Sequence, residues 1–99
     1  EMAKIVDITD KLSFDGNPSL TIKGKTIEVN ADAPTMLKVM NLMDGEPGVK
    51  EIMDVFELMF SGTARKELEK LNLNFADLIV VIQEAVALIA GDGNGRGEQ

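Results

Sequence analysis

Four residue types that carry much of protein chemistry are missing from this chain: cysteine, histidine, tryptophan and tyrosine. Without cysteine no disulfide or thiolate metal site can form, so packing alone must hold the core, and an intracellular location is expected. Without histidine the chain lacks the usual general base near neutral pH and the commonest metal ligand. We therefore expect a protein that is not an enzyme and that needs no cofactor or metal.

Basic residues and long uncharged apolar runs are also scarce. The chain has 10 basic residues against 17 acidic ones, a net charge of −7, whereas nucleic-acid binding depends on clustered Lys and Arg. The longest apolar run, residues 74–90, contains Asp77, Gln83 and Glu84, whereas a membrane-spanning helix needs about 20 largely uncharged residues. No basic segment followed by a hydrophobic signal core opens the chain. We expect a protein of the cytoplasm with neither a nucleic-acid nor a membrane partner.

What remains is typical of one small globular domain. Of the 99 residues, 44% are hydrophobic and 27% are charged, which is enough apolar surface to form a core. Residues 92–99 have glycine at alternate positions and nothing apolar to bury. The sequence therefore predicts a single domain over residues 1–91 and a flexible tail over 92–99.

The N-terminal part predicts extended structure. Residues 3–14 mix apolar and charged side chains without a clean period, so they form a strand or an extended lead-in, and a strand there would be the third of a sheet. The turn formers at residues 15–18 predict a turn.

Residues 19–30 predict a β-hairpin with Gly24 and Lys25 as a two-residue type II′ turn. A turn one residue earlier would set Ile22 opposite Lys25, so the apolar pattern favours the first register. The cross-strand pairs expected on the apolar face are Ile22 with Ile27 and Leu20 with Val29.

Four helices are expected after the hairpin, which together predict an α+β fold. The first runs from Asp32 to Asp44 and stops at Gly45; the second starts at Val49. The third is short, begins at an N-cap on Thr63, and pairs Arg65 with Glu69; the fourth is capped by Asn74 and ends at Gly91. The apolar stripes expected to face the core are Met36, Leu37, Met40 and Met43; Val49, Ile52, Met53, Phe56, Met59 and Phe60; Leu68, Leu71 and Leu73; and Phe75, Ile79, Ile82, Val86 and Ile89.

Two features suggest chemistry at first sight. Gly24-Lys25-Thr26 matches the end of a phosphate-binding loop, but Ser19 stands where that loop needs glycine, and Thr26 starts a strand rather than a helix. One side of the second helix carries Glu51, Asp54 and Glu57. Three carboxylates in such a row have three interpretations: they bind a cation, they act as acid and base, or they face water. Catalysis would require a deep pocket around Glu51 and Asp54, so we interpret all three as surface.

Some apolar residues are left over after the core stripes are assigned. Val80, Val81 and Leu88 lie within about 60° of the polar line through Asp77 and Glu84 on the last helix. They either pack under a neighbouring element or bind a partner protein. Methionine-rich surfaces adapt to partners, so Met36, Met40 and Met43 either fill the core or form a second candidate interface.

Several segments occur in a characteristic order and spacing: DKLSF (10–14), KGKTIEVN (23–30), DAPTMLKVM (32–40), GEPG (45–48), ELMF (57–60) and ARKELEKLNLNF (64–75). Together, over residues 8–91, they resemble the small tail assembly chaperones encoded by long-tailed phages and prophages of Gram-positive bacteria. None of these segments is a catalytic signature.

The resemblance implies a self-associating, non-catalytic chaperone in the cytoplasm of the bacterial host. Such proteins coat the long, aggregation-prone tape measure protein during tail assembly and are absent from the finished virion. The chain would be the short form; a longer form made by translational frameshifting would recruit tail tube protein. The alternative is a small structural tail or connector component that stays in the virion.

Overall fold

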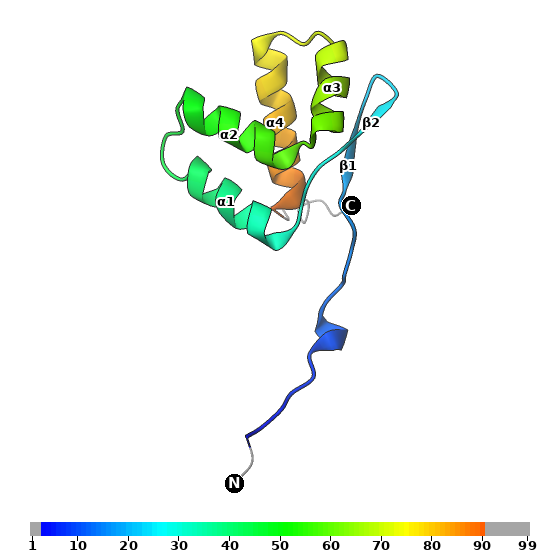
Figure 1. Ribbon diagram of the computed structural model, residues 1–99, viewed down its shortest axis with the longest axis vertical. Coiled ribbons are helices and arrows are strands. Elements are labelled where there is room, and N and C mark those ends of the chain that lie inside the picture. Colours follow the sequence, from blue (N-terminus) through cyan, green and yellow to red (C-terminus); the bar gives the residue numbers. More distant parts are fainter. Residues whose placement is uncertain (1–2, 91–99) are drawn as a thin grey trace.

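The computed structural model describes residues 3–90 and has an α+β fold, as the sequence predicts. An antiparallel hairpin packs against four helices, and a single 3-10 turn, Thr9–Lys11, precedes it (Figure 1). The elements are β1 (Ser19–Ile22), β2 (Lys25–Glu28), α1 (Ala33–Met43), α2 (Val49–Met59), α3 (Gly62–Lys70) and α4 (Phe75–Ile89). Helix α1 packs on α2, β2 on α3, and α2 on α4. The predicted tail and the predicted helix stop at Gly91 lie outside the described residues.

The hairpin forms, but the predicted register is wrong by one residue at the turn. The turn residues are Lys23 and Gly24, with φ of 50° and 79°, and Ile22 stands opposite Lys25. Positive φ at both central positions is the type I′ geometry, which matches the twist of paired strands. The remaining pairs are Ser19 with Glu28, Leu20 with Ile27, and Thr21 with Thr26.

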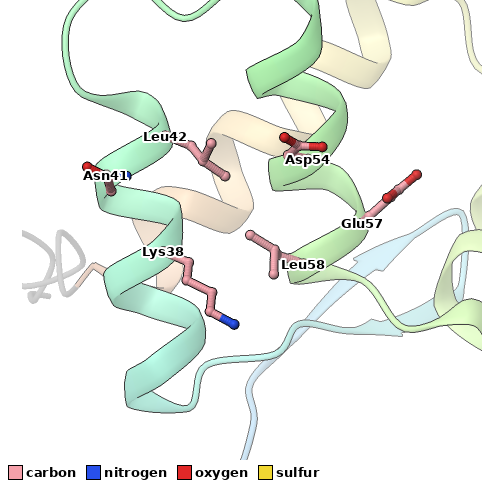
Figure 2. Close-up of a pocket in the computed structure, with 6 residues that line it drawn as sticks. All are labelled: Lys38, Asn41, Leu42, Asp54, Glu57 and Leu58. Carbon is pink, nitrogen blue, oxygen red and sulfur yellow. The ribbon is translucent and has the colours of Figure 1, made fainter.

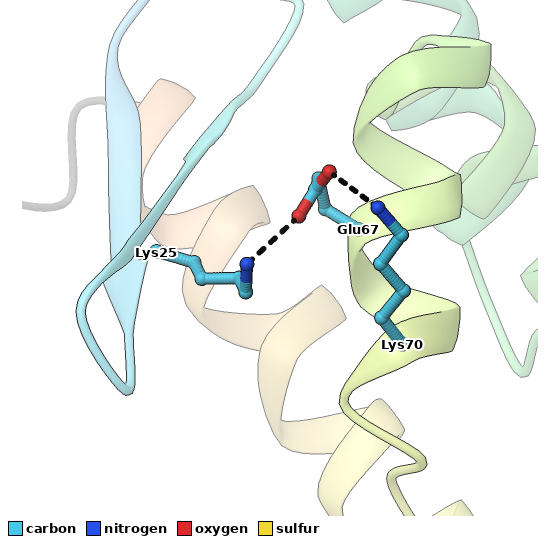
Figure 3. A network of polar contacts seen from close by, with 3 residues as sticks. All are labelled: Lys25, Glu67 and Lys70. Atoms are coloured by element: carbon cyan, nitrogen blue, oxygen red, sulfur yellow. Dashed lines mark hydrogen bonds and ion pairs between the residues drawn. The ribbon is translucent and has the colours of Figure 1, made fainter.

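An ion pair explains why lysine is tolerated on the apolar face of the hairpin. Lys25 lies at the rim, where its Nζ is 3.4 Å from Oε1 of Glu67 on α3 (Figure 3). The second oxygen of Glu67 is 3.3 Å from Nζ of Lys70. These contacts lower the pKa of Glu67, the hydrogen bond and charge of Lys70 contributing most and those of Lys25 next. Apolar patterning alone could not reveal this partner, because Glu67 is distant in sequence.

The predicted turn at residues 15–18 does not form. The chain stays extended there, and the carbonyl of Pro18 accepts a hydrogen bond of 2.9 Å from the Val29 N–H, which continues the ladder. The Asn17 side chain also bonds to β2 and to the residues after it. Its Nδ2 donates to Glu28 (2.8 Å) and its Oδ1 accepts from the Ala31 N–H (3.0 Å). The turn-forming residues therefore anchor the base of an extended segment.

Residues 3–14, which we call the arm, extend away from the body of the molecule (Figure 1). Within residues 3–90 the sheet has two strands, so the third strand considered from the sequence is not formed by the arm. The long axis of the molecule is 62 Å, against 30 and 27 Å for the other two, because the arm adds to one end.

The helix caps are partly as predicted. As predicted, Asn74 caps α4 and Gly45 follows α1 with φ of 80°. Asp32, which was expected to be the first residue of α1, is instead its N-cap and accepts from the Thr35 N–H. The N-cap of α3 is Ser61 rather than Thr63, since the Ser61 hydroxyl accepts from the Ala64 N–H at 3.2 Å.

The end of α2 is held by two residues from other segments. Arg65 donates to the carbonyls of Glu57 (3.2 Å) and Phe60 (2.6 Å), so the predicted pairing of Arg65 with Glu69 is wrong. Asn30 donates to the next two carbonyls, of Leu58 through its side chain and Met59 through its backbone N–H. A guanidinium at a helix C-terminus also offsets the negative end of the dipole. These bonds join the hairpin exit and α3 to α2.

The core agrees with the predicted stripes in part. Its buried residues are Ile27, Val29, Val39, Val55, Met59, Phe60, Ala64, Leu68, Ile82 and Ala85. Leu68, Leu71 and Leu73 face inward as predicted, Leu68 fully and the others in part. On α2 and α4 the predicted stripes are right in part: Met59, Phe60 and Ile82 are buried, and Ile52, Phe56, Val86 and Ile89 pack against the core, whereas Val49, Met53 and Phe75 are exposed. On α1, Met43 is the residue of the predicted stripe that packs against the core. The buried faces also include Val39, Val55 and Ala85, which the predicted stripes omit.

Candidate protein-interaction surfaces

The acidic row on α2 does not gather into one site. Glu51 accepts from the Gly48 N–H at the start of α2 (2.8 Å), and Asp54 pairs with Lys50 (2.8 Å). Among residues 3–90 there is no group of three or more acidic side chains placed to hold a metal ion. Over the same residues, every helix is too short or too polar to cross a bilayer.

An open groove of about 390 Å³ lies between α1 and α2, and we call it the α1–α2 groove (Figure 2). Leu42 and Leu58 point toward one another between the two helices, and charged side chains stand around them. The lining residues are Lys38, Asn41, Leu42, Asp54, Glu57 and Leu58. Leu37, 67% exposed, is not a lining residue but precedes the lining residue Lys38 on α1. An apolar floor with charges of both signs at its rim suits an amphipathic helix.

A second hollow lies between α2 and α4 and is lined only by apolar residues; we call it the α2–α4 pocket. Its volume is about 100 Å³, and its lining residues are Val49, Ile52, Met53, Phe56, Phe75, Leu78 and Ile82. Val49, Met53 and Phe75 are all more than half exposed. An apolar cavity of roughly 150 Å³ can hold a benzene molecule, so this pocket is of the size that one large apolar side chain fills.

The predicted interface residues are distributed over several environments. Val80 and Leu88 are exposed on either side of Glu84, whereas Val81 is half-buried and packs against the core. On α1, Met40 is exposed, Met36 is half-buried, and Met43 packs against the core. None of the six lines the α1–α2 groove or the α2–α4 pocket.

The residues around the α2–α4 pocket were missed because the sequence analysis placed Val49, Met53 and Phe75 in the core. The signal that could have revealed them as a surface is the width of the apolar stripes on the predicted helices. A two-stranded hairpin and three other short helices cannot cover apolar residues spread over more than half of a helix circumference.

The arm is the most exposed apolar segment of the described chain. Ile5 is 92% and Phe14 76% exposed, and the other large apolar side chains there, Val6, Ile8 and Leu12, are exposed as well. Its hydrogen bonds are local. The Lys11 and Leu12 N–H groups donate to the Ile8 and Thr9 carbonyls in the 3-10 turn, and Asp7 accepts from both the N–H (2.9 Å) and the hydroxyl of Thr9, which lowers the pKa of Asp7. Large exposed apolar patches on small proteins usually mark interaction sites.

No protein-family model, curated protein sequence or solved structure matches the chain.

Proposed function

We propose that this protein is a tail assembly chaperone that binds tape measure protein in the cytoplasm of the bacterial host, with the α1–α2 groove as the binding site. The observation that carries the proposal is the groove itself, whose Leu42 and Leu58 floor is open to solvent between two helices. The order of segments described above, from DKLSF to ARKELEKLNLNF, supports the identity of the client.

The groove suits a client of helical, amphipathic character. One apolar stripe of the client would cover Leu42, Leu58 and Leu37, and its flanking charges would meet Lys38 on one side and Asp54 or Glu57 on the other. The net charge of −7 keeps the complex soluble once the apolar surface of the client is covered. Binding of this kind requires no catalytic residue.

The test is solubility of tape measure protein co-expressed with the chaperone. Replacing Leu37→Glu and Lys38→Glu together removes exposed apolar area beside the groove and reverses the charge of a lining residue, so we expect at least a tenfold loss of tape measure protein recovered in the soluble fraction. Both side chains are exposed, so circular dichroism should show an unchanged fold. The matched control is Met53→Gln with Phe75→Gln, which changes the α2–α4 pocket. Recovery equal to wild type with the Leu37→Glu, Lys38→Glu variant would overturn the groove assignment.

Mass spectrometry of purified virions tests the identity of the protein. A chaperone should be absent from mature tails, whereas the alternative, a small structural tail or connector component, should be present at a fixed copy number. Recovery of the chain at stoichiometric amounts would therefore replace the proposed function by the alternative.

A further inference from the structure

We propose that the protein binds a segment of another protein through the α2–α4 pocket and the hollow beside it, and that this segment carries a large apolar side chain and, a few residues away, a lysine or arginine. The surface is separate from the α1–α2 groove and does not depend on what the groove binds. It lies where the end of α3 meets the start of α4, at the opposite end of the body from the arm (Figure 1).

The α2–α4 pocket continues into a second hollow of about 280 Å³. The residues that line this hollow are Phe56, Leu68, Glu69, Asn72, Leu73 and Leu78. Phe56 and Leu78 line both hollows, so the two form one trough, which we call the α2–α3–α4 trough. The pocket part is lined only by apolar residues, whereas Glu69 and Asn72 bring polar groups to the other part. A ligand that fills the trough must therefore be apolar at one end and polar at the other.

The apolar end of the trough is uncovered. Val49, Met53 and Phe75 at the pocket are 73%, 56% and 69% exposed. A single exposed side chain of this kind is ordinary, but three around one cavity form an apolar patch, and such patches usually mark interaction sites. The pocket volume of about 100 Å³ suits one large side chain, such as a leucine, methionine or phenylalanine of a partner.

The polar end of the trough carries a negative charge that the fold does not neutralise. Glu69 is exposed and takes part in none of the ion pairs formed among residues 3–90. Its expected partner Arg65 donates to the carbonyls at the end of α2 instead, and Lys70 lies 3.3 Å from Glu67. The C-terminal end of α3, where the helix dipole is negative, adds to the same potential. This end of the trough therefore favours a cation.

The two ends together define the chemistry of the partner segment. Its apolar side chain enters the pocket, and its lysine or arginine reaches Glu69, beside which the Asn72 carboxamide offers a further hydrogen bond. The apolar contact supplies most of the affinity, because an exposed ion pair contributes little, and the charge decides which segments bind. An acidic segment would be repelled by Glu69 and by the net charge of −7.

The experiment uses the purified full chain and a panel of synthetic peptides, and it follows binding by the NMR methyl signals of Ile52, Met53 and Leu78. Each peptide is capped at both termini and carries one phenylalanine and one arginine, separated by a run of glycines whose length is varied across the panel. We expect saturable shifts with at least one spacing. Alanine in place of the phenylalanine of the peptide, or Met53→Gln with Phe75→Gln in the chain, should abolish them. Circular dichroism of this variant should stay that of the wild type, because both side chains are exposed.

Charge reversal tests the polar end of the trough. The wild type should bind the arginine peptide about threefold or more tighter than the same peptide with glutamate in place of arginine, which is the scale of an exposed ion pair. Glu69→Lys should reverse this preference. The matched control is Glu84→Lys, which changes the net charge equally at an exposed position of α4 that does not line the trough, and it should keep the preference of the wild type.

Three results would overturn the proposal. Absence of saturable shifts at every spacing would show that the trough binds no such segment. The same preference in Glu69→Lys and Glu84→Lys would show that Glu69 does not select the charge of the partner. Shifts of the Ile52 and Met53 signals that depend on the concentration of the chain alone would show that a second copy fills the trough.

These measurements are independent of the proposed function, because they contain no tape measure protein. Their failure leaves the effect of Leu37→Glu and Lys38→Glu on tape measure protein untouched, and the reverse also holds. The two proposals can therefore fail separately.

Discussion

The arm and the hairpin are neighbours in the chain and are both rich in aliphatic residues, yet they end in opposite environments. Ile27 and Val29 of the hairpin region are completely buried, whereas Ile5 of the arm is 92% exposed. The difference lies in what each segment can pack against. The hairpin presents one apolar face to the helix layer and is joined to α3 by the Lys25–Glu67 ion pair, while the arm extends past the end of that layer.

The same contrast recurs within the helices. Val39, Val55 and Ala85 are buried, although larger apolar residues on the same helices, including Leu37, Met53 and Phe75, are exposed. Apolar character is therefore abundant enough in this chain that it does not by itself select the buried face. The elements that meet in the fold do, since the larger Met59 of α2 and the adjoining Phe60 are completely buried as well.

The largest effect is expected when a buried isoleucine of the hairpin is compared with an exposed isoleucine of the arm. Ile27→Ala should lower the free energy of unfolding by about 2–5 kcal/mol, because it removes buried methyl groups and leaves a cavity. Ile5→Ala should leave the free energy of unfolding within about 0.5 kcal/mol of the wild type. Urea denaturation at a protein concentration low enough to keep the chain monomeric measures both. Equal effects would show that the arm is covered in solution.

A second prediction concerns the alanine at the centre of the buried face of α4. Ala85→Leu should destabilise the fold by about 1–3 kcal/mol, since the added atoms overpack a completely buried position. Ala76→Leu, an exposed change on the same helix, is the control and should be close to neutral. Thermal unfolding of the two variants distinguishes the observed core face from the predicted one. A neutral Ala85→Leu would mean that the core has room there.

A smaller effect is expected at the hairpin turn. Gly24 has φ of 79°, a conformation that costs an L-residue about 1–2 kcal/mol, so Gly24→Ala should lower stability by that amount. Gly16→Ala in the segment that leads into the hairpin adds a methyl group with nothing within 4 Å and no left-handed backbone, and should have little effect. Urea midpoints of the two variants make the comparison. Similar midpoints would contradict the type I′ turn.

The smallest effect should come from the ion pair that ties the hairpin to α3. The pKa of Glu67 is lowered in the folded protein, chiefly by Lys70 and then by Lys25. A carboxylate whose pKa is lower in the folded than in the unfolded protein stabilises the fold at pH values above the unfolded pKa. That stabilisation is lost as the pH falls through the folded pKa. The wild type should therefore lose more stability than Glu67→Gln between pH 7 and about pH 3. Glu67 is solvent-accessible, so the difference should be small; urea midpoints at the two pH values measure it, and an identical loss would show that the pair does not form in solution.

Local signals in the sequence were reliable where the chemistry is local. Asn74 caps α4 as expected, and Gly45 follows α1 with positive φ, because these roles depend on neighbours within a few residues. The errors arose where a distant residue decides the outcome. Glu67 makes Lys25 acceptable on the apolar face, and the carbonyls at the end of α2 attract Arg65 away from Glu69.

The candidate interaction surfaces, too, depend on residues that are distant in the sequence. Of the six interface residues proposed from the sequence, Val80, Leu88 and Met40 are exposed, while Val81 and Met43 pack against the core. The groove and the pocket require residues from two helices each, so no single helical stripe could reveal them.

The sequence by itself determined the order of the hairpin and the four helices, the Asn74 cap, the acidic charge and the excess of apolar residues over what the folded body buries. Only the tertiary structure decided which of those residues are covered. Secondary structure follows from contacts between near neighbours, whereas burial depends on which elements meet and how closely their backbones approach. That is why the arm and the hairpin, alike in composition, differ in exposure.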